Sequence, residues 1–310
     1  MLTSKLFRHD GQNFQTRMFG QNFRGLAWSS LDDGLFLVGN GGRVLKVQDG
    51  KPVSIHSGTS HNLRAVAVNA SDGAAIIVGN AGTALLVDQN ENVSNIALPT
   101  FENLRAVAWH REKSMALLAG NNGALFEYSH DGVKTIDAGR ANLRDISWRP
   151  KSDIAFITSN CFAEEFIPSS NLFQYNSETN SATSINEGRV DLLGVDWKQN
   201  GELAVVVGYD VVWHNGFIGT FDGRNVSPVE FESKNVYPVA VAWKPSAGIA
   251  AIATATSRAG IGKGTIYFWN EGSLNPVFAD SEFYFSDVAW SQHGELLAAV
   301  ASTETRTFNS

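Results

Sequence analysis

The chain has 310 residues, 43% of them hydrophobic, and a formal net charge of -7. This length can bury a large core, either in two ordinary domains or in one large β-architecture. With 24 lysines and arginines against 31 aspartates and glutamates, the composition argues against a nucleic-acid-binding protein, because such proteins neutralise phosphates with basic residues.

The cysteine content and the N-terminus favour a reducing compartment. Cys161 is the only cysteine, so no internal disulfide and no cysteine-based metal site can form. The start, "MLTSKLFRHDGQNF", turns polar before the apolar core of a signal peptide is reached, and no apolar run approaches the roughly 20 residues that span a bilayer. Unless a leader was removed, we expect a soluble cytoplasmic protein with no membrane partner.

One short pattern recurs along the whole chain, and two of its copies share the six letters "NLRAVA". The seven copies are "NFRGLAW" 22–28, "NLRAVAV" 62–68, "NLRAVAW" 103–109, "NLRDISW" 142–148, "DLLGVDW" 191–197, "YPVAVAW" 237–243 and "FSDVAW" 285–290. Their last residues lie 39–49 positions apart. Periods of this length are typical of propeller blades and of helical arrays.

The pattern within each unit separates these two architectures. The third unit predicts four short strands, over 104–109, 115–119, 124–128 and 133–137, and no 11-residue window has a helical period. Asp-Gly and Glu-Gly pairs, which favour tight hairpin turns, recur where the third and fourth strands should meet. They are Asp10-Gly11, Asp49-Gly50, Asp131-Gly132, Asp222-Gly223 and Glu271-Gly272. The sequence therefore predicts an all-β, seven-bladed propeller with four-stranded blades.

The two ends of the chain carry complementary halves of one blade. Residues 4–20 look like a third and a fourth strand, whereas the 20 residues after Trp290 suffice only for a first and a second. We expect the N- and C-terminal strands to close the ring in one blade, which leaves no open sheet edge. No linker remains, so residues 1–310 are expected to form a single domain.

Two sets of segments resemble known propellers. "VAWKPSAGIAAIAT" and "LRAVAWHREKSMALLAGNNGALFEYSHDG" resemble the first three strands of WD-repeat-like propellers, although the Gly-His and Trp-Asp pairs of a WD repeat are absent. "VGNGGRVLKVQDG" and "VGNAGTALLVD" also look similar to propellers of the photosystem assembly-factor type. The resemblance implies a binding scaffold, in most members without catalysis, and carries over no active-site residue.

A set of arginines and asparagines marks one face of the predicted ring. The connections between blades and between second and third strands lie on one face, named the top face here; the other connections lie on the bottom face. Near the top ends of the first and second strands, the first four units carry Arg24, Arg64, Arg105 and Arg144, with Asn40, Asn80, Asn121 and Asn160. Each arginine is either a strut for carbonyls of the adjacent turn, with asparagine tolerating left-handed backbone before glycine, or part of a crescent that binds an acidic peptide, a phosphate or a carboxylate.

The connections between second and third strands are longer in units four to seven. Phe162, Phe166, Tyr209 and Trp213 lie in them, and side chains of these types anchor interfaces. We take Phe166, Tyr209 and Trp213 as candidate anchors; the alternative is that these rings fold back over their own blades. The tryptophans that end the repeats are instead expected to pack between blades.

No catalytic, metal or cofactor site is predicted. Glu164 and Glu165 are adjacent and would point in opposite directions, the seven histidines are scattered, and "GIGKGT" 260–265 lacks the spacing of a phosphate loop. We expect a non-catalytic scaffold that binds a protein or an acidic peptide across the top face. The alternatives are a small-ligand or carbohydrate binder that uses the long loops beside Trp213, and a hydrolase or lyase whose polar residues meet only in space.

Overall fold

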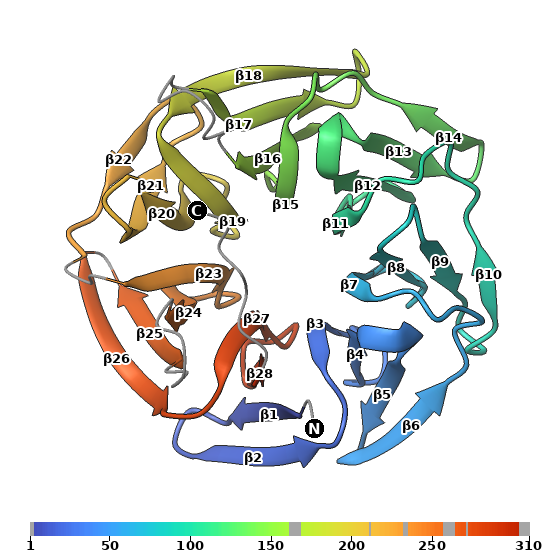
Figure 1. Cartoon of the computed structure of the whole chain (residues 1–310), viewed down its shortest axis with the longest axis horizontal. Coiled ribbons are helices and arrows are strands. Elements are labelled where there is room, and N and C mark those ends of the chain that lie inside the picture. The colour runs from blue at the N-terminus through green and yellow to red at the C-terminus, as the bar shows by residue number, and fades with distance from the viewer. Residues whose placement is uncertain are drawn as a thin grey trace.

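The computed structural model describes residues 3–160, 169–210, 212–231, 235–256, 264–270 and 272–303. They form seven antiparallel four-stranded sheets arranged in a ring around a central axis (Figure 1). The predicted seven-bladed, all-β propeller is therefore confirmed.

The first four blades take their strands in chain order from the axis outward. Blade 1 contains β3 (Phe23–Trp28), β4 (Leu35–Gly39), β5 (Val44–Gln48) and β6 (Lys51–Ile55). Blade 2 contains β7 (Leu63–Val68), β8 (Ala75–Gly79), β9 (Ala84–Val87) and β10 (Val93–Asn95). Blade 3 contains β11 (Leu104–Trp109), β12 (Met115–Gly120), β13 (Leu125–Ser129) and β14 (Gly132–Thr135). Blade 4 contains β15 (Asn142–Trp148), β16 (Ile154–Asn160), β17 (Ser169–Asn176) and β18 (Ser181–Gly188).

The remaining blades complete the ring. Blade 5 contains β19 (Val190–Trp197), β20 (Ala204–Asp210), β21 (Asn215–Phe221) and β22 (Val226–Pro228). Blade 6 contains β23 (Val236–Trp243), β24 (Ile249–Thr256), β25 (Gly264–Asn270) and β26 (Ser273–Asp280). Blade 7 contains β27 (Tyr284–Trp290), β28 (Leu297–Ser302), β1 (Ser4–His9) and β2 (Phe14–Phe19). Two 3-10 turns, η1 (Asn40–Gly42) and η2 (Asn121–Gly123), follow β4 and β12, and no described helix has the length and hydropathy to cross a bilayer.

Blade 7 is closed by both ends of the chain, as the sequence predicts. β1 pairs antiparallel with β28, from Ser4 opposite Ser302 to His9 opposite Leu297, and β2 pairs with β1. Leu6 and Phe7 are buried, and the Phe7 ring lies 4.9 Å from that of Phe278 and 5.0 Å from that of Phe285. The N-terminal hairpin therefore contributes core as well as ladder bonds to the blade.

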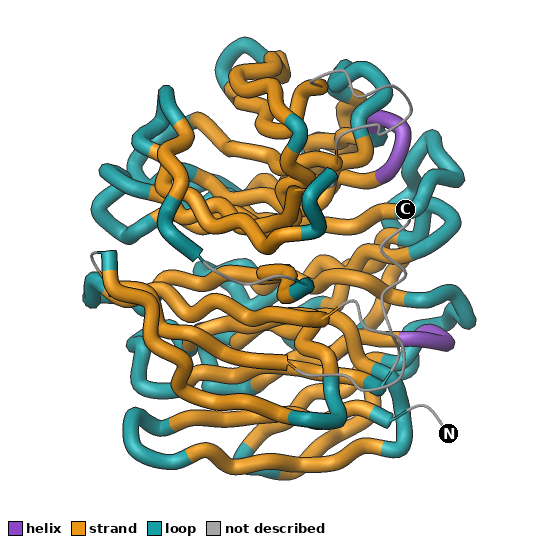
Figure 2. Tube along the Cα trace, turned by 60° about the vertical axis from the view of Figure 1, so that its left-hand side comes forward, coloured by secondary structure: helices purple, strands orange, loops and turns teal. Residues whose placement is uncertain are grey.

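The second strands form the most deeply buried layer of the ring. Every residue of β4, β8 and β12 is buried, because these strands have neighbours within the sheet and blades against both faces. Because these strands are apolar at every position, they present apolar side chains to the neighbouring blades on both faces of the sheet. Figure 2 shows the strands running between two groups of loops, which are the top and bottom faces.

The tryptophans that end the inner strands join neighbouring blades, as predicted. Four of them donate an indole N–H to a carbonyl of the preceding blade: Trp28 to Ala289 at 3.1 Å, and Trp109 to Ala67, Trp148 to Ala108 and Trp290 to Ala242, each at 3.2 Å. Trp197 and Trp243 are buried in the same way without an acceptor for Nε1. These rings therefore serve blade packing.

Candidate functional site

Each inner strand carries a β-bulge near its top end, at the mouth of the central channel. In blade 1 the register shifts between Phe23 and Gly25, so Arg24 is the extra residue, and the other six blades shift at the equivalent position. A bulge re-aims the side chain of its extra residue. The bulged residues are Arg24, Arg64, Arg105 and Arg144 in blades 1–4 and Leu193, Val239 and Ser286 in blades 5–7.

The arginine and the asparagine of each blade are hydrogen-bonded to one another. The Nε–H of the arginine donates to Oδ1 of the asparagine in all four blades. The distances are 2.8 Å for Arg24–Asn40, 2.9 Å for Arg64–Asn80, 3.2 Å for Arg105–Asn121 and 2.6 Å for Arg144–Asn160. This bond explains why the two residue types occur together and disappear together along the chain.

The predicted backbone role of the asparagines is wrong. The residues with positive φ are the ones that follow, Gly41 at 65°, Ala81 at 53° and Asn122 at 52°. Asn40 and Asn121 instead begin the 3-10 turns and are not among the described residues with positive φ. The side chain is therefore the functional part of each of these asparagines, because it accepts the arginine.

The asparagine that opens the second, third and fourth repeats joins each of these blades to the preceding one. Asn62 Oδ1 accepts the backbone N–H of Gly41 at 2.9 Å, and its own carbonyl accepts the N–H of Asn80 at 2.9 Å. Asn103 and Asn142 cap the preceding turn in the same way, at 3.1 and 3.0 Å. The repeated letters "NLR" thus supply a cap for the preceding turn, a buried core residue and a bulged arginine.

The glycines that end these turns permit the close approach of the next blade. A Cβ on Gly42 would lie 1.9 Å from the carbonyl oxygen of Thr59, and one on Gly123 would lie 1.8 Å from that of Gly139. Both glycines also have φ near +70°, a region that side chains disfavour. The top face of blades 1–4 is therefore one hydrogen-bonded layer.

Blade 5 lacks the arginine–asparagine pair, because Leu193 and Tyr209 stand at its two positions, and it has a tyrosine–aspartate bond instead. Tyr209, which the sequence places in a loop, belongs to β20 at the position of Asn40, is buried, and donates its hydroxyl to Asp191 Oδ2 at 2.8 Å. Burial and then Asp191 raise the pKa of the Tyr209 phenol. Burial lowers the pKa of Arg144, while Asp191 and Tyr209 raise it. Asp191 is therefore close enough to balance part of the Arg144 charge.

Aromatic and apolar side chains occupy the other half of the channel mouth. Tyr209, Tyr237 and Tyr284 are buried in one cluster with Val239, and the rings of Tyr209 and Tyr237 lie 5.1 Å apart. Leu193 packs against this cluster. The mouth is thus lined by arginines over blades 1–4 and by tyrosines and aliphatic residues over blades 5–7.

Two aromatic side chains project from the top-face loops. Trp213 is 71% exposed, and its loop is fixed because Asp210 Oδ1 accepts the backbone N–H groups of Val212 and Trp213. Phe101, between β10 and β11, is 91% exposed and was not among the residues selected from the sequence. The only sequence feature that could have indicated Phe101 is that it is a single aromatic residue in the connection between β10 and β11. Phe162, Phe166, Glu164 and Glu165 lie outside the described residues.

Carboxylates lower in the channel connect inner strands that share no ladder. Asp145 Oδ2 accepts the N–H of Val195 at 2.9 Å, and Asp287 Oδ2 accepts that of Leu26 at 2.9 Å. Asp196 Oδ2 accepts the N–H of Trp243 at 2.7 Å. Within the described ranges, no group of three His, Cys, Asp or Glu side chains could hold a metal ion.

These carboxylates predict a pH dependence of stability. Burial raises the pKa of Asp145 to about 7, against the pull of N–H groups from Val195 and Ile146. Because the folded-state pKa lies above the unfolded value, the contribution of Asp145 to stability increases as the pH falls from about 7 toward 4. The side chain borders the channel and is only half-buried, so we expect a small rise in Tm, about 2–4 °C.

The readout is the difference between wild type and Asp145→Asn in thermal melts at pH 5 and 8. The difference is needed because His110 acts in the opposite direction. Burial lowers the pKa of His110, so its contribution to folding stability falls as the pH falls through 6.5. Parallel Tm curves for the two proteins would contradict the assignment to Asp145.

A prediction about binding arises from the two exposed aromatics. Phe101→Ala and Trp213→Ala should each leave Tm within about 2 °C of wild type, because neither ring is buried. Loss of a ring that is a central anchor should weaken the binding of a top-face partner by ~2 kcal/mol or more. Calorimetric titration with a captured partner measures the loss. Unchanged affinity in both variants would exclude these rings as anchors.

The comparisons with known proteins concern the fold. No protein-family model matches the sequence, and no curated protein matches it. Among solved structures, the WD40 repeats of RRP9 align with a TM-score of 0.74 at 11% identity, over 94% of this chain and 91% of that chain. U3-55K aligns at 0.70 and 11%, over 91% and 89%, and the hydrazine synthase of Kuenenia stuttgartiensis at 0.74 and 13%, over 93% and 97%. The chain is thus a seven-bladed propeller similar in fold to WD40-repeat proteins, at identities too low to transfer a site.

Proposed function

We propose that the protein is a non-catalytic scaffold that binds a partner protein, through an acidic segment, across its top face. The observation that carries the proposal is the exposure of two aromatic rings, Phe101 at 91% and Trp213 at 71%, on the face whose channel mouth holds four arginines. Aromatic and arginine side chains are the types enriched at the centres of protein interfaces.

The positive charge of this mouth supports an acidic partner. The chain as a whole carries a net charge of -7, so four arginines around one mouth, with Asp191 beside only Arg144, are a local concentration of positive charge. Their field attracts an acidic segment before contact is made, which raises the rate of association and selects against basic partners. The proposal needs the charges of the arginines and not any particular unused N–H group.

The rigidity of the top face supports binding without rearrangement. The arginine–asparagine bonds and the asparagine caps hold blades 1–4 as one layer, and the turn of Trp213 is fixed by Asp210. A surface that is already ordered loses little conformational entropy when a partner binds. Trp213 stands out from the surface, which suits a broad partner better than an enclosed sugar.

The test is capture of partners from an extract of the native organism with three forms of the protein. The wild type is compared with Phe101→Ala/Trp213→Ala and with the matched control Met18→Ala/Val53→Ala, whose side chains are 52% and 51% exposed on outer strands. Quantitative mass spectrometry should show acidic proteins that are lost with the first variant and retained with the control. Equal recovery with both variants would contradict the proposal.

A further inference from the structure

The bottom face carries a second repeated feature, which lies outside the proposed site. In blades 3–6 the residue that follows the end of the inner strand covers the tryptophan of the next blade. The His110 ring lies 4.6 Å from Trp148, the Arg149 guanidinium 4.9 Å from Trp197, and the ammonium groups of Lys198 and Lys244 lie 5.8 and 5.1 Å from Trp243 and Trp290. Long basic side chains cover apolar surface with their stems and keep their charge in water.

Several of the described cations on this face form no ion pair, although Arg111 lies near enough to Asp196 to oppose the rise in the pKa of that carboxyl that burial causes. Among the described residues, Arg149, Lys198 and Lys244 form no ion pair, and neither do the exposed Arg111 and Lys151 on the same loops. The Nε–H of Arg149 donates to the carbonyl of Gly201 at 2.9 Å.

Blade 1 has Ser29 at the corresponding position, and its Lys46, on β5, is neutralised by carboxylates. Lys46 lies 2.7 Å from Asp32 and 3.4 Å from Glu91 on the same face. Unpaired like charges repel one another, so a group of them on one side of an acidic protein points to an anionic partner.

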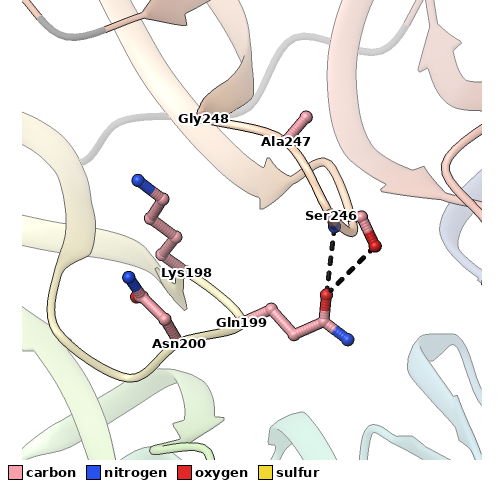
Figure 3. A pocket seen from close by; sticks show the side chains of 6 residues that line it. All are labelled: Lys198, Gln199, Asn200, Ser246, Ala247 and Gly248. Atoms are coloured by element: carbon pink, nitrogen blue, oxygen red, sulfur yellow. Dashed lines mark hydrogen bonds between the residues drawn. The ribbon is translucent and has the colours of Figure 1, made fainter.

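The surface is not flat, because a shallow pocket lies beside Lys198. It lies between the loops that follow β19 and β23 and is lined by Lys198, Gln199, Asn200, Ser246, Ala247 and Gly248. The two loops are joined where Gln199 Oε1 accepts the backbone N–H of Ser246 at 3.0 Å (Figure 3). In Figure 3 the ammonium end of Lys198 extends away from this bond, beside Asn200.

The shape of the charge distribution decides the class of partner. The hairpin turns between the outer two strands lie on the same face and present exposed aspartates at the rim, namely Asp10, Asp49, Asp131 and Asp222. A membrane or a nucleic-acid duplex laid across this face would meet the rim carboxylates and be repelled. An extended peptide can pass between them and place its carboxylates against the inner lysines.

We propose that the bottom face of blades 3–6 is a second binding surface, which takes an acidic peptide segment of a partner protein. Arg149, Lys198 and Lys244 form its inner row, with Arg111 and Lys151 beside them. A scaffold with this surface holds one partner on each face of the ring.

The test uses a fluorescein-labelled octaglutamate peptide and fluorescence anisotropy at low salt. The variant Lys151→Gln/Lys198→Gln/Lys244→Gln should bind about tenfold more weakly than wild type, with a shallower salt dependence, because each lysine adds a screened attraction. The control Arg17→Gln/Lys51→Gln/Lys134→Gln removes the same charge from exposed positions on the outer strands β2, β6 and β14, away from both proposed surfaces, and should stay within about twofold of wild type.

A second variant, with the same three lysines changed to arginine, keeps all three charges and the side-chain stems of residues 198 and 244 over their tryptophans, and should bind as wild type does. Equal losses in the glutamine variant and its control, or no binding by wild type, would overturn the proposal. Tighter binding of duplex DNA or of anionic vesicles, lost in the same variant, would also overturn it by assigning the surface to another class of partner.

Discussion

Removal of residues 1–20 is expected to leave a protein that is largely unfolded at 37 °C. The deletion takes away β1 and β2 and exposes the edge of β28 along its whole length. It also removes Leu6 and Phe7, which are 3% and 1% exposed in the full chain. Loss of one such buried side chain costs about 2–5 kcal/mol, and a typical domain is stable by about 5–15 kcal/mol. Circular dichroism melts should therefore show a Tm more than 10 °C lower, or no cooperative transition.

Point variants separate the loss of closure from a general sensitivity of the N-terminus. Phe7→Ala should cost about 3–5 kcal/mol by leaving a cavity between Phe278 and Phe285. Gln15→Ala and Thr16→Ala, at two exposed positions of the outermost strand β2, should change stability by less than about 0.5 kcal/mol. A truncated chain that melts as the full chain does would show that blade 7 does not need its N-terminal half.

Arg144→Ala is expected to destabilise the protein by about 1–3 kcal/mol, because it leaves Asn160 Oδ1 without the donor that lies 2.6 Å away. In a double-mutant cycle with Asn160→Ala, the coupling energy should reach about 0.5–3 kcal/mol, as for residues in direct contact. Chemical denaturation of the four proteins measures it.

Arg140→Ala is the matched control for Arg144. Arg140 is an exposed arginine just before β15 on the same face, and its loss should change stability by less than about 0.5 kcal/mol. A coupling energy near zero would mean that the Arg144–Asn160 bond adds nothing to stability and that the arginines are kept for binding alone. A large coupling energy identifies them as struts whose charge also shapes the channel mouth.

The ring could be predicted from the sequence because its signals are local and repeated. Asp-Gly turns, the repeat ending in tryptophan and the half-blades at the two ends each depend on a few neighbouring residues. The predicted strands of the third unit agree with β11, β12 and β13 to within one residue. The fourth ends two residues early, at Thr135, although Ile136 still donates to the carbonyl of Leu125 at 2.9 Å.

The geometry of the channel mouth was harder to predict from the sequence, because it depends on how neighbouring strands pair. A bulge is a property of the register of two strands, so nothing in the alternation of β3 alone marks Arg24 as the extra residue. Tyr209 stands at the position of Asn40 in the repeat and Asp191 at that of Asn62, so their pairing could have been predicted from the repeat. Phe101 lies in a connection between blades rather than in a long loop, and a single aromatic residue there does not show from sequence whether it is exposed.

The bottom-face cations had a sequence signal of their own. In units 3–6 the tryptophan is followed at once by a basic residue or histidine, as in Trp148-Arg149 and Trp197-Lys198. The sequence pattern correctly assigns the tryptophans to packing, but it makes no assignment for the residues that follow them. Only the structure shows that each of these residues packs against the tryptophan of the next blade.

Hydrogen exchange of the protein with and without a captured partner tests the top-face proposal most directly. The account predicts slower exchange in the peptides that contain Phe101 and Trp213 when the partner is bound, and unchanged exchange in the outer strands β2 and β6. Protection of the outer strands or of the bottom face, with exchange at Phe101 and Trp213 unaltered, would contradict it.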